Sequence, residues 1–246
     1  MRIRWLALLP TVALLAALQP GLAAELAAVV GQPRCSASSP WPAKLKMEYV
    51  ATAKLGPLSL DGENEVGFTV EQGRYRMHSA TRSSLYRAQQ ESRGAVEGRA
   101  LRPQEYTEQR QRRAASTTTI DWAARTVSFS ANAEQPGSTS PALQDRLTVL
   151  LQLGERLRAG GTGAIELPVA GARHVSAYRF ERRGAESLTL PAGQFETYKL
   201  ERQNEERDEA IELWLAPSLC WLPVKLRFTD ERGLVVENAL RRAVFD

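Results

Sequence analysis

The chain has 246 residues, of which 43% are hydrophobic and 24% charged, with 32 basic and 28 acidic side chains. This near balance of charge argues against binding through a nucleic-acid phosphate backbone, so nucleic acid is not an expected partner. The length is sufficient for one well-buried core, and a single domain is the most economical prediction.

The first 24 residues have the composition of an export signal. Arg2 and Arg4 precede an apolar run over residues 6–18, and small residues follow at positions 21–24, where a signal peptidase would cut. The apolar run is too short to span a bilayer as a helix, and no second run of about 20 apolar residues occurs. We therefore expect a signal peptide over residues 1–24 and a soluble, exported mature chain without a transmembrane segment.

A change of pattern near residue 44 marks the start of the folded domain. Residues 25–43 are rich in proline and serine and lack periodicity, which predicts an irregular lead-in. Residues 44–246 are expected to form one β domain, because short strand-like runs follow one another with turn residues between them. Asp61-Gly62 and Gln72-Gly73 are expected to supply turns or bulges. The first four runs cover residues 45–54, 58–70, 74–82 and 85–97.

Residues 85–116 are polar on both alternating faces. Such a strand has no apolar face, so it is expected either to project as a solvated hairpin or to line a wet cavity. Arg110, Arg112 and Arg113 on this hairpin are the best candidates for contact with a partner, because guanidinium groups bind phosphates bidentately. The alternative is a solvated tip that protects the edge of the sheet.

One helix is expected after Ser140-Pro141, where serine can cap exposed amides and proline suits the first turn. Gly160 and Gly161 would end it. Apolar residues recur within it at three- and four-residue spacing, which indicates one buried face. These residues are Leu143, Leu147, Leu150, Leu151 and Leu157.

The C-terminal half alternates apolar and polar residues with a period of two, as in Ile211, Leu213 and Leu215. Trp122 and Trp214 are candidates for a ligand or partner surface, although such aromatic residues are more often part of a core or its rim. The whole pattern predicts a mainly β fold: a single antiparallel barrel or half-barrel of about ten strands, with one amphipathic helix.

Cys35 and Cys220 are the only cysteines. An exported chain passes through an oxidising compartment, so the two thiols can form a disulfide, and closing so long a loop would contribute roughly 4–5 kcal/mol in the chain-entropy model. The alternative is a buried free thiol at Cys220 with Cys35 in an unattached lead-in.

No catalytic or metal-binding motif is found. The chain has no Gly-x-Ser-x-Gly, His-Glu-x-x-His or Cys-x-x-Cys sequence, and His78 and His174 have no nearby partner in the sequence. We expect no enzymatic activity, no cofactor and no metal. Both histidines are expected to be ordinary surface or hydrogen-bonded residues.

Several turn and strand signatures carry a family resemblance. They are residues 190–200 (Leu-Pro-Ala-Gly-Gln-Phe-Glu-Thr-Tyr-Lys-Leu), 212–215, 222–226, Ile120-Asp121-Trp122 and the predicted helix around residues 145–147. With these signatures the chain resembles the bacterial exported family called domain of unknown function 3108. The resemblance implies an exported, mostly β protein without established activity, and it supplies no functional residue. The closing strands are also distantly similar to envelope lipoprotein carriers, whose half-barrels hold acyl chains beneath a helical lid.

Together, the export signal and the resemblance indicate the periplasm. The leading expectation is a protein that binds a lipid or another apolar or amphipathic envelope ligand without catalysis. The alternative is a non-enzymatic protein-interaction module in cell-envelope assembly, with an envelope protein as partner and the hairpin at Arg110–Arg113 or an edge strand as contact surface.

Overall fold

The structure of the protein is a computed structural model. It describes residues 28–33, 35–36, 41–111, 113–160, 162–204 and 209–246. The expected signal peptide, residues 1–24, and the candidate residue Arg112 lie outside the described residues.

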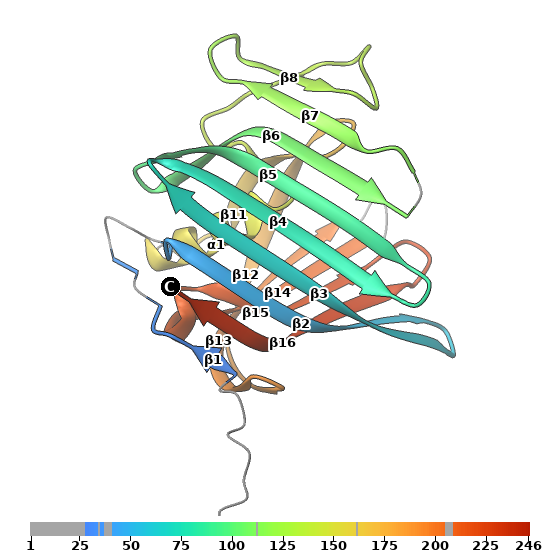
Figure 1. The fold of residues 1–246 in the computed structure, drawn as a ribbon, viewed down its shortest axis with the longest axis vertical. Coiled ribbons are helices and arrows are strands. Elements are labelled where there is room, and N and C mark those ends of the chain that lie inside the picture. Colours follow the sequence, from blue (N-terminus) through green and yellow to red (C-terminus); the bar gives the residue numbers. More distant parts are fainter. Residues whose placement is uncertain (1–27, 34, 37–40, 112, 161, 205–208) are drawn as a thin grey trace, which may run out of the picture.

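The described residues form a mainly β fold with one α-helix, as the sequence predicts (Figure 1). The helix α1 spans Thr148–Arg158, and a short 3-10 helix spans Pro217–Leu219. The strands are β1 (Val29–Val30), β2 (Lys44–Leu55), β3 (Leu58–Glu71), β4 (Arg74–Ser83), β5 (Arg87–Glu97), β6 (Ala100–Arg110), β7 (Ser116–Asp121), β8 (Thr126–Phe129), β9 (Gly137–Ser138), β10 (Gln144–Asp145), β11 (Ile165–Ala170), β12 (Val175–Leu190), β13 (Gly193–Asn204), β14 (Glu209–Ala216), β15 (Leu222–Thr229) and β16 (Val235–Phe245).

The strands build one curved, 16-stranded sheet. Its order runs from β10 through β11–β16, then β2–β8, to β9, and β1 pairs with β16 outside this path. Most neighbours are antiparallel, but β1 with β16 and β10 with β11 are parallel pairs. The sheet is therefore mainly antiparallel, as predicted, but it has more strands than the predicted ten. Two-residue strands such as β1, β9 and β10 are too short to give a period-two pattern in the sequence.

The sheet is barrel-like but open, since no ladder among the described residues joins β9 to β10. Two residues on each of these strands offer few backbone groups for pairing. Side chains fill the gap instead: Ile120, Val127 and Phe129 from β7 and β8 pack with Leu143 and Ala170. The half-barrel form of the prediction is the one observed.

Helix α1 begins later than the sequence predicts. Residues after Pro141 first form β10, and the Asp145 Oδ1 atom accepts hydrogen bonds from the backbone N–H groups of Leu147 and Thr148, both at 2.8 Å. These bonds fix the start of α1 at Thr148, so Leu143, expected on the helix, precedes it. The helix lies against β6, β10, β11 and β15.

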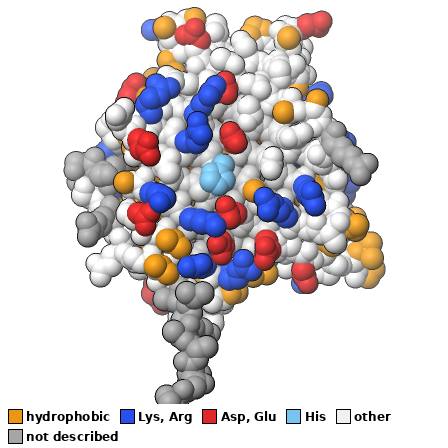
Figure 2. All heavy atoms as spheres, in the orientation of Figure 1, with side chains coloured by type: hydrophobic (Ala, Val, Ile, Leu, Met, Phe, Trp, Pro, Cys, Tyr) orange, Lys and Arg blue, Asp and Glu red, His pale blue; other side chains and the backbone are white. Residues whose placement is uncertain are grey.

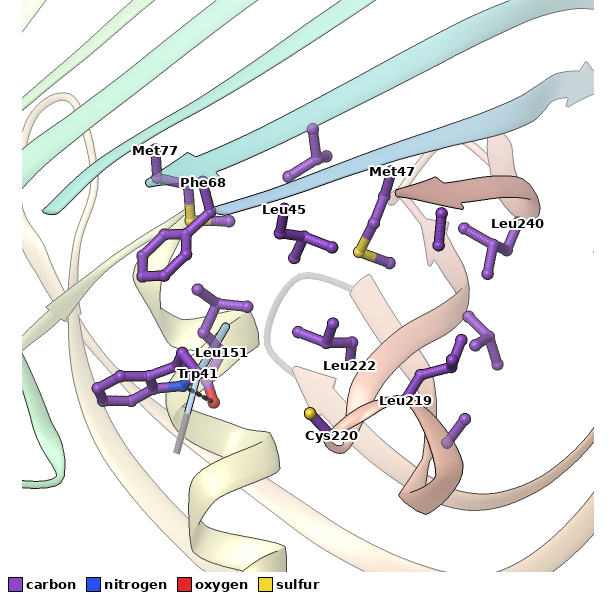
Figure 3. Packing of buried hydrophobic residues seen from close by; sticks show 14 of the residues in the cluster. Trp41, Leu45, Met47, Phe68, Met77, Leu151, Leu219, Cys220, Leu222 and Leu240 are labelled. Carbon is purple, nitrogen blue, oxygen red and sulfur yellow. Dashed lines mark hydrogen bonds between the residues drawn. The ribbon is translucent and has the colours of Figure 1, made fainter. Parts of the chain in front are cut away.

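Side chains fill the inner face of the sheet (Figure 3). Leu45, Met47 and Phe68 from β2 and β3 are at most 2% exposed and belong to one cluster with Leu151 of α1. Trp41, from the expected lead-in, is 4% exposed and donates its indole N–H to the Leu151 carbonyl oxygen at 3.5 Å. The lead-in thus contributes to the core.

Two further contacts attach the lead-in to the C-terminal half. Val29 and Val30 pair with β16, and Cys35 forms a disulfide with Cys220, with 6.0 Å between the Cα atoms. The stretch expected to be irregular therefore contains a short strand and a covalent link. Of the two arrangements that the sequence left open for the cysteines, the structure contains the bridge.

The two dipeptides predicted to form turns or bulges, Asp61-Gly62 and Gln72-Gly73, differ in structure. Gln72 and Gly73 form the turn between β3 and β4 with φ angles of 50° and 75°. Gly62 instead lies inside β3, where a Cβ atom would stand 2.6 Å from the Arg82 carbonyl oxygen. The Asp61-Gly62 turn prediction was wrong, because this glycine serves close strand approach.

No helix among the described residues is long and apolar enough to cross a membrane.

Candidate functional site

The polar strands β5 and β6 meet the segment around β10 and α1. Ser92 is 1% exposed, and its hydroxyl donates to the Asp145 Oδ2 atom at 2.5 Å. The Tyr75 hydroxyl lies 2.9 Å from the Ser92 Oγ atom. Glu108 accepts hydrogen bonds at its Oε2 atom from the Tyr106 hydroxyl at 2.8 Å and from Arg146 at 3.1 Å.

The helix α1 also forms hydrogen bonds and an ion pair with β6 and with the turn that joins β5 to β6. Gln152 accepts a hydrogen bond from the Leu101 N–H at 3.1 Å and donates to the Arg99 carbonyl oxygen at 3.1 Å. Arg99 also pairs with Glu155. The polar stretch is therefore neither a projecting hairpin nor, around Ser92 and Glu108, the wall of a wet cavity, because residues far along the chain bury its inward side chains.

Burial shifts the pKa of the acidic groups in this cluster. It raises the pKa of Asp145 above its ordinary value of 3.8, and hydrogen bonds from Ser92, Thr148 and Leu147 oppose this rise. Burial also raises the pKa of the Tyr75 and Tyr106 hydroxyls, with a smaller contribution from nearby carboxylates. Asp145 is 0% and Ser92 is 1% exposed, so this cluster is not accessible to solutes in the observed conformation. Its role is to position α1.

The two candidate tryptophans take part in internal contacts. Trp214 is 5% exposed, donates its indole N–H to the Glu186 Oε2 atom at 2.7 Å, and lies between Lys199 and Lys225, whose Nζ atoms are each 4.9 Å from the ring centroid. Trp122 is half-buried and donates to the Pro103 carbonyl oxygen at 2.7 Å. Trp214 is thus covered, and the polar edge of Trp122 is already bonded.

Neither histidine belongs to a metal-binding group among the described residues. The His78 Nε2 atom is 3.7 Å from the Glu65 Oε1 atom, and its ring lies over Gly67 of the neighbouring strand. His174 is exposed in the turn between β11 and β12.

Arg110 and Arg113 are exposed at the turn that follows β6. The Arg110 Nη2 atom is 3.7 Å from the Glu108 Oε1 atom, and the Arg113 N–H donates to the Arg110 carbonyl oxygen at 3.1 Å. The β2–β3 and β4–β5 turns lie at the same end of the sheet, on the right of Figure 1.

This end carries the most exposed large apolar side chains of the described residues. Leu58 and Leu85 are 71% and 74% exposed, and Leu55 is 45% exposed. The β4–β5 turn is tied to the turn after β6, because Gln111 donates its side-chain amide to the Leu85 carbonyl oxygen at 3.0 Å. We call this surface the leucine end and define it by Leu55, Leu58, Leu85, Arg110 and Arg113.

Basic and acidic side chains surround a histidine on the face of the molecule drawn in Figure 2. Two hollows lie along β4–β6, and residues of β3 also line the larger one. The smaller hollow, of about 320 Å³, adjoins the leucine end and is lined by Thr81, Arg82, Arg87, Ala88, Gln89, Gln109 and Gln111. The larger hollow, of about 740 Å³, lies at the opposite end of β4 and β5 and is lined by Thr69, Glu71, Gln72, Arg74, Tyr75, Arg76, Arg93, Gln104 and Glu105.

The sequence interpretation placed the ligand or partner surface on the arginines at positions 110, 112 and 113 and on Trp122 and Trp214, and it did not include the leucines. A signal was present, because leucines flank Gly56-Pro57 and follow Ser83-Ser84, positions where turns usually carry polar residues. Arg82 and Arg87 gave no such signal, because only the strand register brings them together.

Among solved structures, a beta-barrel-like protein of domain of unknown function DUF1849 from Brucella abortus is similar to this chain. The TM-score is 0.60 at 10% sequence identity, over 83% of this chain and 98% of that chain. At this identity the likeness shows the fold alone.

Two further solved structures share little of the geometry. A DUF1329 family protein from Desulfovibrio piger has a TM-score of 0.28 at 10% identity, over 83% of this chain and 86% of that chain. A putative outer membrane lipoprotein-sorting protein domain from Vibrio parahaemolyticus has a TM-score of 0.27 at 10% identity, over 82% and 85% of the two chains. Scores this low support no conclusion about this protein.

No curated protein matches the chain. The family model described as Protein of unknown function (DUF3108) matches residues 52–238, which is most of the chain and confirms the resemblance seen in the sequence. The chain belongs to the DUF3108 family of proteins of unknown function.

Proposed function

We propose that this protein is exported to the periplasm, has no catalytic activity, and binds an amphipathic ligand of the cell envelope at its leucine end. The ligand is the surface of an anionic lipid layer. The observation that carries this proposal is the exposure of Leu58 and Leu85, at 71% and 74%, at the end of the sheet where the Leu85 turn is hydrogen-bonded to the turn of Arg110 and Arg113.

The chemistry of the leucine end fits an interface between water and lipid. Transfer of one exposed leucine side chain from water to an apolar phase contributes about 1.5–3 kcal/mol. Each basic side chain near an anionic lipid surface adds about 1 kcal/mol. Arg110 and Arg113 are exposed at the turn beside Leu85, so apolar and cationic contacts can form together.

A binding site on the outside agrees better with the packing than one inside the half-barrel. An acyl chain on the inner face would have to displace side chains such as Leu45, Met47 and Phe68, which are at most 2% exposed. Such a change would remove the contacts that hold α1 to the sheet. We therefore retain a lipid as the proposed ligand, as in the envelope carriers, but place its binding site on the surface and not inside the half-barrel.

The proposed absence of catalysis is supported by the burial and the hydrogen bonding of the polar side chains. Ser92 and Asp145, a hydroxyl and a carboxyl in contact, are both buried and hold the start of α1. Their positions suit a structural role.

Vesicle flotation tests the proposal. The mature chain should float with vesicles that contain phosphatidylglycerol and should float less as salt approaches about 0.5 M, because salt screens the arginine contribution. The double variant Leu58→Ser/Leu85→Ser should bind about tenfold more weakly or worse, since two apolar contacts are lost.

Tyr198→Ser provides the matched control, because Tyr198 is exposed on β13, away from the leucine end. It should bind vesicles as the unaltered chain does. Failure of the unaltered chain to bind anionic vesicles, or unchanged binding by the double leucine variant, would overturn the proposal in favour of a protein-interaction module that uses an envelope protein as partner.

A further inference from the structure

We infer that the smaller hollow, between Arg82 and Arg87, is a binding site for the phosphate group of a lipid headgroup. This inference rests on the proposed function and deepens it, because it replaces general attraction to a charged surface with recognition of one chemical group. The hollow and the leucine end are adjacent: Leu85 lies in the turn that joins the strands of Arg82 and Arg87.

The strand register places two positive charges face to face. Arg82 on β4 is directly opposite Arg87 on β5. Cβ atoms of directly opposite residues are about 4.5–5.5 Å apart, and like charges in this position are destabilising. A negatively charged phosphate group between the two guanidinium groups would replace this repulsion with an attraction to both of them.

The surrounding residues leave the two charges uncompensated. The Arg82 and Arg87 side chains take part in no ion pair among the described residues. Glu63, the residue opposite Arg82 on β3, is paired with Arg241 at 2.8 Å. The lining of the hollow includes no carboxylate.

The remaining polar residues give the site a defined shape. Gln109 donates its side-chain amide to the Arg113 carbonyl oxygen at 3.2 Å, within the turn after β6, and Gln111 donates to the Leu85 carbonyl oxygen at 3.0 Å, which holds this turn against the β4–β5 turn. Gln89 lines the same hollow from β5. A volume of about 320 Å³ suits a headgroup better than a whole lipid. A phosphate held there would leave the acyl chains beside Leu85.

The larger hollow, on the same strands, also contains two arginines opposite each other, but carboxylates there balance their charge. Arg76 is directly opposite Arg93, but Arg93 pairs with Glu105 at 2.8 Å, and Glu71 also lines this hollow. The two hollows therefore have the same arginine pairing and differ in their carboxylates. This makes the Arg76 and Arg93 pair a matched control.

Calorimetric titration with sn-glycerol 3-phosphate tests the site without a membrane. The unaltered chain and the control variant Arg76→Gln/Arg93→Gln should bind this probe, and Arg82→Gln/Arg87→Gln should lose about tenfold or more in affinity, because both charged donors are removed. Both variants remove the same charge, so equal losses of affinity would indicate diffuse attraction and overturn the inference.

Thermal unfolding shows whether the Arg82→Gln/Arg87→Gln variant is folded. Without ligand, Arg82→Gln/Arg87→Gln should have a Tm no lower than that of the unaltered chain, because a like-charge contact is removed. Glycerol 3-phosphate should raise the Tm of the unaltered chain and not that of the variant. A ligand-dependent rise in both would also overturn the inference.

Vesicle binding separates this inference from the proposed function. Leu58→Ser/Leu85→Ser should still bind glycerol 3-phosphate while it loses binding to phosphatidylglycerol vesicles. Vesicle binding without binding of the soluble probe would contradict the headgroup site and leave the proposed function standing. Binding of the probe without binding of vesicles would contradict the lipid as source of the phosphate and the proposed function with it.

Discussion

At the scale of single residues, Gly154 shows how closely α1 approaches the rest of the chain. A Cβ atom at this position would stand 2.3 Å from the Trp221 carbonyl oxygen. The neighbouring backbone has little room to move, because Cys220 and Trp221 both have left-handed φ angles, of 60° and 61°, and Cys220 is in the disulfide. Glycine is therefore required here by space.

The variant Gly154→Ala should lower the free energy of unfolding by about 1–3 kcal/mol, since the added methyl group overpacks a fixed contact. Alanine otherwise favours a helix over glycine by about 1 kcal/mol, so a loss of stability would identify the contact as the cause. Urea unfolding measures the change. Gly163→Ala is the control, because nothing lies within 4 Å of its Cβ position, and a change of the same size there would contradict the argument.

At the scale of elements, the buried polar cluster joins the β5–β6 hairpin to β10 and α1. Asp145 contributes most, because it accepts from Ser92 and from two backbone N–H groups at the start of the helix. Burial raises the pKa of this carboxyl above 3.8. A carboxyl with a raised pKa in the folded chain binds its proton more tightly there than in the unfolded chain, so its ionisation opposes folding.

The variant Asp145→Asn should therefore be at least as stable as the unaltered chain near pH 7, because asparagine keeps one oxygen for the backbone N–H groups and carries no charge. As the pH falls through the raised pKa toward 3.8, the unaltered chain should gain stability relative to the variant. Urea unfolding of both proteins at several pH values measures this difference.

The variant Asp145→Ala separates charge from hydrogen bonding. Relative to Asp145→Asn it should lose about 1–3 kcal/mol at every pH, because the N–H groups of Leu147 and Thr148 lose their acceptor and neither variant carries a charge at this position. A difference between the unaltered chain and Asp145→Asn that does not vary with pH would show that the carboxyl keeps its ordinary pKa.

At the scale of the whole molecule, the N-terminal segment is attached to the C-terminal half. The disulfide joins residues 185 positions apart, β1 extends the sheet at β16, and Trp41 packs beneath α1. These contacts make the lead-in part of the domain.

The variant Cys35→Ser/Cys220→Ser should be less stable by about 2–5 kcal/mol, because the unfolded chain is no longer cross-linked. Denaturant unfolding with and without a reductant measures this loss, and the reductant should have no effect on the variant. Two free thiols in the denatured, unreduced protein would show that the bridge does not form.

The sequence alone determined what depends on local periodicity. The alternation of Ile211, Leu213 and Leu215 indicated strands, the leucine spacing from Leu147 to Leu157 indicated a helix, and the turn and strand signatures indicated the family. These features depend on neighbours within a few residues, where side-chain geometry fixes the pattern.

Only the tertiary structure decided what depends on contacts between distant segments. Ser92 finds its partner 53 positions away, at Asp145, so the polar pattern of β5 and β6 could not reveal that inward side chains such as Ser92 are buried. Likewise, the exposure of Leu58 and Leu85 at one end and the pairing of Arg82 with Arg87 follow from strand length and register. The pairing partner of a strand and the side chains that cover it are set by the packing of the whole chain, and the candidate site arises from that packing.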